Sequence, residues 1–439
     1  MACDSANAEL NLGTELKLDA ADFLQRYWQK RPKLMRQALC NFDCPISAND
    51  LAGLACTEGS LARIVQGTGK RFRVASGPFS DASFTGLGSS NWTLLVQEVD
   101  QWDRNVRELL KHFDFLPRWR IEDVMVSYAV RGGSVGAHVD QYDVFLLQGR
   151  GQRRWQIDDR AQAKTAARQQ FLPKAKLKLL AHFAPNRDWI LNPGDLLYLP
   201  PGVPHHGVAL DDDCMTFSIG LRAPSATELL ENFAHTQAQK LAESVRYSDP
   251  NLTAQTHPVA LDSASVTRVR ETLAKAIQLS DTELGAWFAN FMSAYRSSKL
   301  VLPDRAAGVN SSPSASAALA ARSASTSAAL AARSASTSAA LAARPASTSA
   351  QQAATKLGDR LATGASLTLA PGMRVIQWQG ALHMGGQKII CDAQMQSVLS
   401  AFSVHINAAV WQRLSANSQA LVLKLKRANA LIFTLNHQT

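Results

Sequence analysis

The feature that most constrains the fold of this chain is a His-x-Asp pair, His138 and Asp140, followed downstream by His205. Residues 136–146 are typical of a β-strand, and side chains two positions apart on a strand point to the same face. Residues 192–205 are typical of a turn, an apolar strand and a proline-rich turn that ends in a histidine. A β-fold that brings these two segments together supplies one pocket with three metal ligands.

Two histidines and one carboxylate are the ligand set of non-haem Fe(II) oxygenases. This facial triad occupies one face of an octahedral iron and leaves the opposite positions open for a bidentate co-substrate and dioxygen. Zinc prefers a tetrahedral site that is richer in His or Cys. A bare His-x-Asp pair is more often an ordinary polar pair on an exposed strand or turn. The interpretation as a metal site therefore depends on what surrounds the pair.

The residues that follow the pair support a site for an anionic co-substrate. Residues 145–157 predict a strand, a glycine-containing hairpin turn and a second strand with two arginines. Arg153 and Trp155 share one face of that strand, and Arg154 lies on the other. The planar guanidinium of a buried arginine binds a carboxylate through two parallel hydrogen bonds, as a dicarboxylate such as 2-oxoglutarate would require.

Several longer segments carry a resemblance to a known family. The chain resembles the JmjC-type, cupin-fold 2-oxoglutarate oxygenases and, within them, the bacterial ribosomal oxygenases, through residues 23–32, 115–127, 138–145, 200–205 and 218–224. The resemblance covers the chain apart from one insert. It implies an α+β protein with a double-stranded β-helix catalytic domain that hydroxylates an arginine of the sixteenth large-subunit ribosomal protein, L-sixteen.

The resemblance also assigns roles to residues of this chain. It implies that His138, Asp140 and His205 are the iron ligands and that Arg153 anchors 2-oxoglutarate, with dioxygen as the second co-substrate. The chain departs from the family pattern at His206, where the family has a different polar residue. Because adjacent strand residues face opposite sides, we expect His205 to bind the metal and His206 to point away.

A substrate pocket is predicted beside the metal. Alternation over residues 123–127 places Asp123, Met125 and Ser127 on one face, and Tyr142 shares a face with the iron pair. A carboxylate, a thioether and a phenol can surround a guanidinium and its methylene stem, whereas Ser127 lies deeper and can contact the co-substrate. The alternative from position alone is that Met125 and Ser127 fill the barrel and Asp123 is a solvated strand end. The family resemblance favours function for Asp123 and Tyr142.

Composition fits a protein that works in an anionic environment. The formal net charge is +10 and the sequence pI is about 9.4, which suggests ribosomal RNA or ribosome-associated targets. A basic surface with no nucleic-acid contact is an equal alternative, because no RNA-binding motif is visible. The cysteines lack paired zinc spacing and are expected to be free thiols, at Cys3, Cys40, Cys44, Cys56, Cys214 and Cys391. With no signal-peptide or membrane-spanning pattern, we expect a soluble cytoplasmic protein.

Four regions are predicted along the chain. Residues 1–222 form the catalytic domain. Residues 223–302 contain two capping-box helices, and the family implies that this helical region mediates homodimerisation. Residues 303–355 carry an 11-residue Ala/Ser repeat with too little apolar area for a core and are predicted to be a linker without chemistry. Residues 356–439 are a small α/β region, for which the family implies a winged-helix-like domain.

The function that this reading favours is Fe(II)- and 2-oxoglutarate-dependent hydroxylation of an arginine β-carbon in L-sixteen. Histidine hydroxylation and lysine demethylation are alternatives within the enzyme class, and Asp123 argues against demethylation because it suits a guanidinium. A non-enzymatic cupin-like metal-binding protein and a nucleic-acid-binding regulator are the alternatives outside that class. Succinate production with a substrate peptide distinguishes the former, and salt-dependent RNA or DNA binding that survives His138→Ala distinguishes the latter.

Overall fold

The computed structural model describes residues 15–69, 71–160, 171–172, 177–254, 259, 261–295, 348–370, 372–401 and 404–435. The chain divides into two compact units. The first unit consists of Met1–Tyr295 and Pro371–Ile389, and the second of Arg296–Ala370 and Ile390–Thr439. The repeats within residues 303–347 lie outside the described residues.

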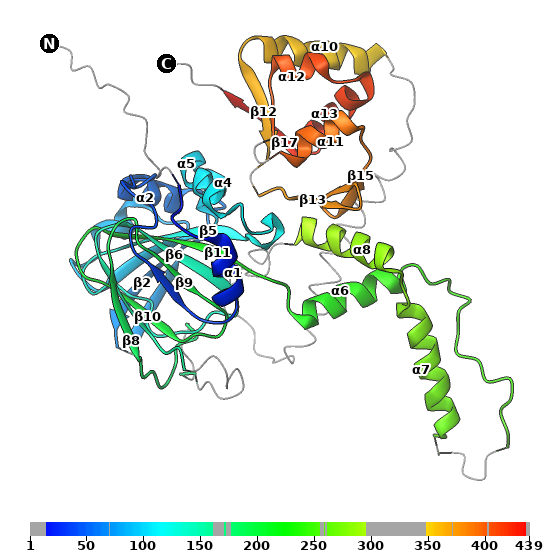
Figure 1. Cartoon of the computed structure of the whole chain (residues 1–439), viewed down its shortest axis with the longest axis horizontal. Coiled ribbons are helices and arrows are strands. Elements are labelled where there is room, and N and C mark those ends of the chain that lie inside the picture. The colour runs from blue at the N-terminus through cyan, green and yellow to red at the C-terminus, as the bar shows by residue number, and fades with distance from the viewer. Residues whose placement is uncertain are drawn as a thin grey trace. The chain divides into compact units, whose positions relative to one another are not determined.

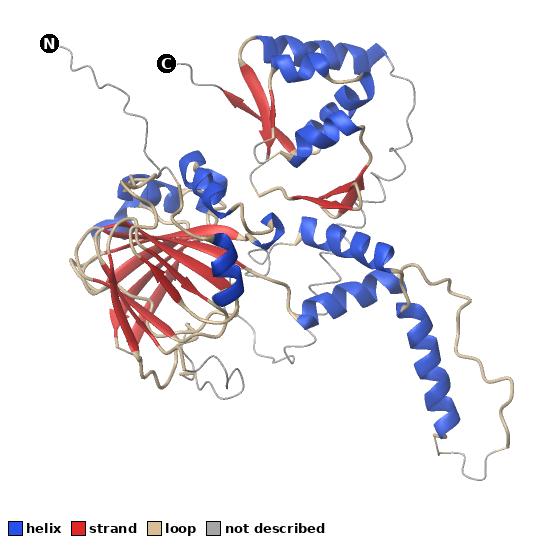
Figure 2. Ribbon diagram, viewed as in Figure 1, coloured by secondary structure: helices blue, strands red, loops and turns tan. Residues whose placement is uncertain are grey.

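Two antiparallel β-sheets form the body of the first unit, with the strands gathered together in Figure 2. The larger sheet has the order β1-β9-β6-β11-β5-β4-β2-β3, and the smaller has the order β10-β7-β8. This arrangement confirms the coarse prediction of a cupin-like fold with antiparallel sheets and helices. The strands are β1 (Lys33–Met35), β2 (Ala62–Thr68), β3 (Arg71–Ser76), β4 (Trp92–Val96), β5 (Asp123–Ala129), β6 (Asp143–Arg150), β7 (Arg153–Ile157), β8 (Arg187–Leu191), β9 (Leu196–Leu199), β10 (His205–Ala209) and β11 (Cys214–Leu221).

Alternation along β6 separates two apolar clusters. Phe145 and Leu147 belong to the cluster that the N-terminal helices cover. Val144 and Leu146 belong to a second cluster, which they share with residues of the smaller sheet. This second cluster therefore marks the interior between the two sheets. Any side chain on the same face as Val144 and Leu146 points into the barrel.

Short helices cover the outer face of the larger sheet (Figure 1). Side chains cap the N-termini of two of these helices. Asp19 accepts a hydrogen bond from the N–H of Asp22 at the start of α1, and Ser47 accepts one from the N–H of Asp50 at the start of α2. Their buried apolar residues complete the outer cluster. They are α1 (Ala20–Arg26), α2 (Ala48–Cys56), α3 (Asp81–Thr85), α4 (Val99–Trp102), α5 (Arg104–Glu108) and the 3₁₀ helices Leu109–Phe113 and Arg118–Arg120.

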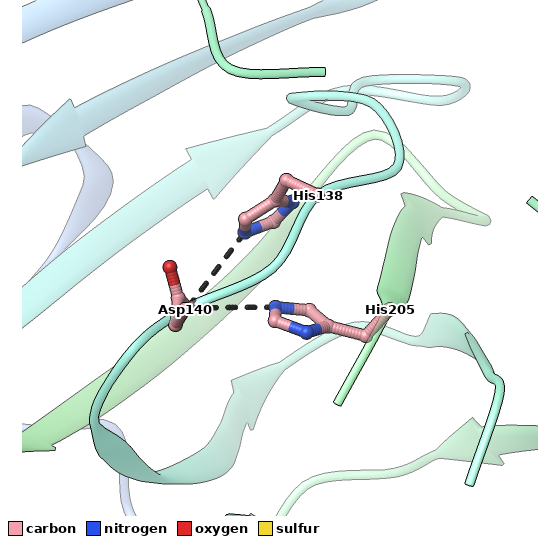
Figure 3. A group of neighbouring side chains, drawn as sticks. All are labelled: His138, Asp140 and His205. Atoms are coloured by element: carbon pink, nitrogen blue, oxygen red, sulfur yellow. Dashed lines mark ion pairs between the residues drawn. The ribbon is translucent and has the colours of Figure 1, made fainter. Parts of the chain in front are cut away.

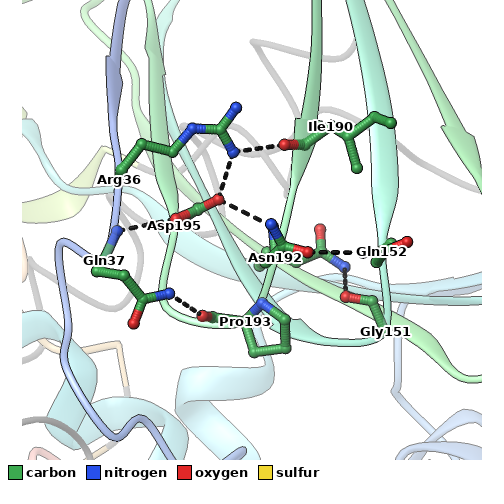
Figure 4. Close-up of polar contacts among 9 residues, drawn as sticks. Arg36, Gln37, Gly151, Gln152, Ile190, Asn192, Pro193 and Asp195 are labelled. Carbon is green, nitrogen blue, oxygen red and sulfur yellow. Dashed lines mark hydrogen bonds and ion pairs between the residues drawn. The ribbon is translucent and has the colours of Figure 1, made fainter.

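The turn before β9 holds the N-terminal segment against the barrel (Figure 4). The carboxylate of Asp195 is buried and accepts hydrogen bonds from Arg36 Nη1 at 2.7 Å, from the Gln37 N–H at 2.8 Å and from the Asn192 N–H at 2.9 Å. Gly194 has a φ of +84°, and a Cβ there would lie 2.3 Å from the Leu39 carbonyl oxygen. Only glycine fits this turn without a shift of the backbone.

A buried polar network secures the start of β6. The carboxylate of Asp143 is fully buried and accepts hydrogen bonds from the Tyr198 hydroxyl at 2.5 Å, Gln29 Nε2 at 2.9 Å and Arg120 Nη2 at 2.8 Å. Burial raises the pKa of Asp143, and these donors oppose that effect. The network joins residues far apart in the sequence, so it fixes the N-terminal segment onto the sheet.

Three helices follow the barrel: α6 (Ala226–Ala238), α7 (Ser263–Ile277) and α8 (Asp281–Ala294). Capping boxes at Ser225 and Ser280 start α6 and α8, as predicted. One face of α8 packs against the sheet β13-β14-β15, built from Val375–Trp378, Ala381–Met384 and Gln387–Ile389. At that contact the indole of Trp378 occupies the space where a Cβ of Gly285 would be.

The second unit is a small α/β module. The predicted strand over 431–435 is confirmed as β17, and β12 pairs with it and with β16 in an antiparallel sheet. Buried Leu357, Leu367, Trp411 and Val422 form part of its core. The elements are α10 (Thr348–Ala362), β12 (Ala365–Leu369), α11 (Ala393–Ser400), β16 (His405–Ile406), α12 (Ala408–Arg413), α13 (Ala416–Arg427) and β17 (Leu431–Leu435).

The structure corrects the predicted organisation in three places. Strands β6 and β7 do not form a hairpin, because β6 pairs with β9 and β11 and β7 pairs with β8 and β10. Helix α10 begins at Thr348, inside the predicted linker, because its buried leucines give that segment a core to pack on. The segment Pro371–Ile389 belongs to the first unit, because it packs on α8, and not to a continuous domain over 356–439.

Candidate metal centre and co-substrate pocket

The segment that carries His138 and Asp140 differs from the predicted strand. His138 forms a single β-bridge with His205, in which each N–H donates to the other residue's carbonyl oxygen at 3.0 Å. Residues 139–142 form no strand, and β6 begins at Asp143. Pro200, Pro201 and Pro204 lack N–H donors, so no regular ladder continues from this bridge, although the Gly202 N–H donates to the Asp140 carbonyl oxygen at 2.8 Å. The bridge nevertheless holds the two histidines side by side.

Three side chains converge at this point (Figure 3). The candidate ligand atoms of His138, Asp140 and His205 all lie within 4.8 Å of one another. Asp140 Oδ2 lies 3.8 Å from His138 Nε2 and 3.5 Å from His205 Nε2. Among the described residues, this is the group of His, Cys, Asp and Glu side chains close enough to hold a metal ion. The predicted ligands are therefore brought together.

Both imidazoles are oriented by hydrogen bonds to the backbone. His138 Nδ1 lies 3.0 Å from the Gly136 carbonyl oxygen, and His205 Nδ1 lies 2.9 Å from the Val203 carbonyl oxygen. A carbonyl oxygen only accepts, so each Nδ1 carries the proton in these contacts. Each Nε2 then presents a lone pair toward Asp140. Metal-binding histidines are commonly fixed in this way, so the donor set fits a divalent cation.

Burial distinguishes His205 from its neighbour. His205 is 2% exposed, and burial, with the nearby His138, lowers its pKa to about 4. A neutral imidazole is the form that binds a metal. The ring of His206 lies against Phe183, with the ring centroids 6.2 Å apart, and His206 is not part of the metal-ligand group. His205 thus lies within the candidate metal-ligand group and His206 lies outside it.

Arg153 is buried in the barrel interior without an acceptor for two of its donors. Its side chain is 5% exposed, and its Nε and Nη2 atoms have no hydrogen-bond partner among the described residues. Arg154 lies on the opposite face, is exposed and pairs with Asp188. A buried cation with unused donors is costly unless an anion completes it. Arg153 therefore fits the predicted role of carboxylate anchor.

The predicted substrate residues lie on the interior face. Met125 and Ser127 pair across β11 with Ser218 and Thr216, and Ser218 in turn pairs with Leu146 of the interior cluster. Because directly paired residues share a face, Asp123, Met125 and Ser127 point into the barrel. The Ser127 hydroxyl donates to the Thr216 carbonyl oxygen at a long 3.4 Å. Asp123 is not a solvated strand end, because it is partly buried.

Asp123 and Tyr142 share an acidic environment with Asp140. Burial and the neighbouring Asp100 raise the pKa of Asp123 to about 7, although the Glu98 N–H donates to its Oδ2 at 3.2 Å. Burial, followed by the charge of Asp140, raises the pKa of Tyr142 well above its ordinary value. Tyr142 is thus a neutral hydrogen-bonding phenol, and the pocket carries carboxylates that favour a cationic guest.

Sequence reasoning missed a polar ladder deep in the barrel. Gln148 is fully buried on β6, and its Oε1 accepts a hydrogen bond from the Thr216 hydroxyl at 3.0 Å. Ser127 pairs with Thr216, so Gln148, Thr216 and Ser127 together form a polar floor of the barrel. A glutamine within an apolar strand was the available signal, because alternation places Gln148 on the interior face with Leu146. Trp155 was placed on the face of Arg153 but given no role.

Comparison with known proteins agrees with this geometry. A family model described as a JmjC domain matches residues 108–229, which hold the metal ligands, Arg153 and the predicted substrate residues. A second model, an AraC-like ligand binding domain, matches residues 182–307, a range that includes strands β8 to β11 and helices α6 to α8. The fold and site thus define a JmjC-domain protein with a His/Asp/His metal centre.

Individual relatives narrow this class. The chain is 40% identical over 282 residues to the ribosomal protein uL16 3-hydroxylase of Escherichia coli, which covers 64% of this chain and 73% of that protein. It is 39% identical over 214 residues to a probable ribosomal oxygenase of Haemophilus influenzae, which covers 48% of this chain and 52% of that protein. The protein belongs to the family of JmjC-domain ribosomal oxygenases.

Solved structures of the family match over nearly their whole length. The E. coli ribosomal oxygenase YcfD in complex with cobalt and succinic acid has a TM-score of 0.71 at 30% identity, with 95% of this chain and 99% of that chain covered. The same enzyme with cobalt and 2-oxoglutarate has a TM-score of 0.70, the same identity and the same coverage. These relatives hold a metal and a dicarboxylate within the same fold.

Proposed function

We propose that this protein is an Fe(II)- and 2-oxoglutarate-dependent oxygenase that hydroxylates the β-carbon of an arginine in uL16, the sixteenth protein of the large ribosomal subunit. One observation carries the proposal. A single barrel contains a His/Asp/His cluster and a buried guanidinium with two unused donors. That pair of features matches what a metal-chelating dicarboxylate needs, and the relatives are named for uL16 hydroxylation and ribosomal oxygenation.

The site residues have different roles in the proposed reaction. His138, Asp140 and His205 would hold the metal, and Arg153 would bind the distal carboxylate of 2-oxoglutarate. Bound Fe(II) and 2-oxoglutarate supply the activation of dioxygen. The apolar interior and the polar floor at Ser127 exclude bulk water and fix the co-substrate. The chain thus contributes position and exclusion of water, which decide where oxidation occurs.

An arginine side chain is the substrate that suits the pocket. Asp123 offers a carboxylate to a guanidinium, and Tyr142 and Met125 offer a phenol and a thioether to its planar head and methylene stem. Burial and the neighbouring Asp100 raise the carboxyl pKa of Asp123 to about 7, so its charged form is disfavoured in the free protein. A guanidinium supplies a compensating cation. Held at its head, the side chain would place an aliphatic carbon near the group of His138, Asp140 and His205.

The test is incubation of purified uL16 with the protein, Fe(II) and 2-oxoglutarate, followed by peptide mass spectrometry. We expect one arginine peptide to gain the mass of one oxygen atom, with one succinate formed per hydroxylation. His138→Ala should abolish both products. Arg154→Gln should retain both, because Arg154 is exposed on the other face of β7. Oxygen on a histidine instead of an arginine would contradict the substrate assignment.

We also propose that the protein is a homodimer that assembles through its helical region. Helix α7 has no buried residue, and Val266, Val269, Leu273 and Ile277 form an exposed apolar stripe at helical spacing. A second copy is the occupant we infer, because a two-fold interface lets one stripe cover another.

The remaining assignments concern the second unit and the location of the protein. The second unit, with α12 and α13 beside the sheet β16-β12-β17, is proposed to be a winged-helix-like module. Among the described residues, no helix is both long and apolar enough to cross a membrane. We propose the cytoplasm as the location, because ribosomal proteins are the substrate class.

A further inference from the structure

The indole of Trp155 has an unexplained N–H. Its side chain is 6% exposed, and its Nε1 has no hydrogen-bond partner among the described residues. A buried tryptophan normally finds an acceptor for this donor, because an unmade hydrogen bond is costly. Arg153, two residues earlier on β7, has two further unpartnered donors. Three buried N–H groups from one strand thus lack an acceptor.

The strand register places Trp155 between the metal and Arg153. Along the pairing of β10 with β7, His205 lies opposite Ile157, Gly207 opposite Trp155, and Ala209 opposite Arg153. These three pairs form successive layers of the interior. A co-substrate that reaches from the metal at His205 to the guanidinium of Arg153 passes through the layer of Trp155.

Distances agree with this placement. The ring centroid of Trp155 lies 5.8 Å from that of His205, and the Arg153 Cζ atom lies 5.9 Å from the indole centroid. The indole therefore neighbours both ends of the proposed co-substrate site. Trp28, Trp119 and Trp287, by comparison, pair with the rings of Tyr198, Phe288 and Phe233.

Gly207 determines how the indole is turned. A Cβ at Gly207 would lie 2.7 Å from Cη2 and Cζ3 of Trp155 and 3.0 Å from its Cε3. These atoms are the benzo edge of the indole, so that edge packs against the glycine on β10. The Nε1 atom is on the opposite edge and points away from that strand. Glycine at 207 thus seats the ring with its N–H directed away from β10.

We propose that Trp155 is a further co-substrate-binding residue, whose indole N–H donates a hydrogen bond to the carboxylate of 2-oxoglutarate that Arg153 binds. The inference rests on the proposed function, because it needs that ligand. Arg153 and Trp155 then form one cradle of N–H donors, and the dicarboxylate provides the acceptor that each of them lacks in the free protein. The role of the tryptophan is polar as well as apolar.

The test is calorimetric titration of 2-oxoglutarate into the full-length protein loaded with Mn(II), in the absence of dioxygen and substrate. Trp155→Phe keeps an aromatic ring and removes the N–H. We expect its Kd for 2-oxoglutarate to rise about tenfold or more, as for a lost hydrogen bond to a charged group. Mn(II) affinity and the thermal midpoint of the ligand-free protein should stay at wild-type values, because no partner of the N–H is lost.

Trp189→Phe is the matched control. Trp189 lies opposite Trp155 on β8 and packs against the same cluster, but its nitrogen is not among the buried unpartnered atoms. Its replacement should leave the Kd unchanged. Combining Trp155→Phe with Arg153→Met should cost less than the two single changes added together, because both donors serve one carboxylate.

The outcomes separate the inference from the proposed function. Absence of 2-oxoglutarate binding by the wild-type protein would refute the proposed function. Normal binding by the wild type and equal binding by Trp155→Phe would overturn the inference alone. A parallel fall in Mn(II) affinity and in the ligand-free thermal midpoint would also overturn it, because the ring would then have only a structural role.

Discussion

At the scale of single residues, the site contains two buried charged groups that lower the stability of the ligand-free protein. Arg153 has two donors without an acceptor, and Asp123 carries a raised carboxyl pKa. Both costs fall when an anion and a cation enter, respectively. Binding sites commonly hold such destabilising groups because ligand binding relieves them. Two predictions follow from these residues.

Arg153→Met tests the cost of the buried guanidinium. Methionine fills a similar volume without a charge, so the ligand-free variant should be as stable as the wild type or more stable, by up to about 2 kcal/mol. Its affinity for 2-oxoglutarate should fall at least about 100-fold, because a charge-paired bidentate contact is lost. Urea unfolding and calorimetry measure the two effects. A strongly destabilised variant would mean that Arg153 has an internal partner.

Asp123 makes stability depend on pH. Its folded-state pKa of about 7 lies above the ordinary carboxyl value of 3.8, so only the unfolded chain loses the proton between these values. The contribution of Asp123 to stability is therefore full below pH 3.8 and is lost as pH rises through about 7. Asp123→Asn should remove this loss. The difference in free energy of unfolding between variant and wild type should therefore grow by about 1–3 kcal/mol, in favour of the variant, from pH 5 to pH 8. Urea unfolding at both pH values measures it, and an unchanged difference would contradict the assigned pKa.

At the scale of elements, the turn between β8 and β9 fixes the N-terminal segment on the barrel. Gly194→Ala places a Cβ against a backbone oxygen at a positive φ, so it should lower the free energy of unfolding by about 2–4 kcal/mol. Gly202→Ala is the matched control, because Gly202 has a φ of +82° and no atom near its Cβ position. It should cost only about 1 kcal/mol. Equal costs in denaturant titrations would show that the contact with Leu39 does not matter.

Many features of the individual strands and helices could be predicted from the sequence. Alternation correctly predicted the faces of β5 and β7, and capping boxes correctly predicted the starts of α6 and α8. The strand expected through Asp140 was wrong, because prolines in the partner segment end the ladder at His138. The metal cluster was predicted nonetheless, because the bridge keeps the two histidines adjacent.

Long-range contacts were beyond prediction. Gln29 and Asp143 are joined by a hydrogen bond across 114 positions, and no local pattern predicts that a polar side chain near the N-terminus reaches a buried carboxylate. The same holds for Arg374, whose guanidinium donates to the Ile121 and Tyr295 carbonyl oxygens and joins the segment before β13 to distant parts of the first unit. Such contacts depend on the folded arrangement of distant elements and leave no periodicity in the sequence.

At the scale of the whole molecule, the exposed stripe of α7 predicts the oligomeric state. Leu273→Glu combined with Val269→Glu places two charges in the proposed interface and should convert a dimer to a monomer in light scattering. Lys275→Glu is the charge-changing control on the opposite face of α7, and it should remain dimeric. A monomeric wild type, or a dimer that survives the double change, would contradict assembly through α7.

The most direct test of the account is a cobalt titration, because the central claim concerns which side chains hold the metal. Wild type and His206→Ala should each bind one Co(II) per chain and show a change in visible absorption when 2-oxoglutarate is added. His138→Ala and His205→Ala should lose at least about 100-fold in Co(II) affinity and lose that change. Retention of full Co(II) binding by His205→Ala, together with its loss in His206→Ala, would contradict the assignment of the centre.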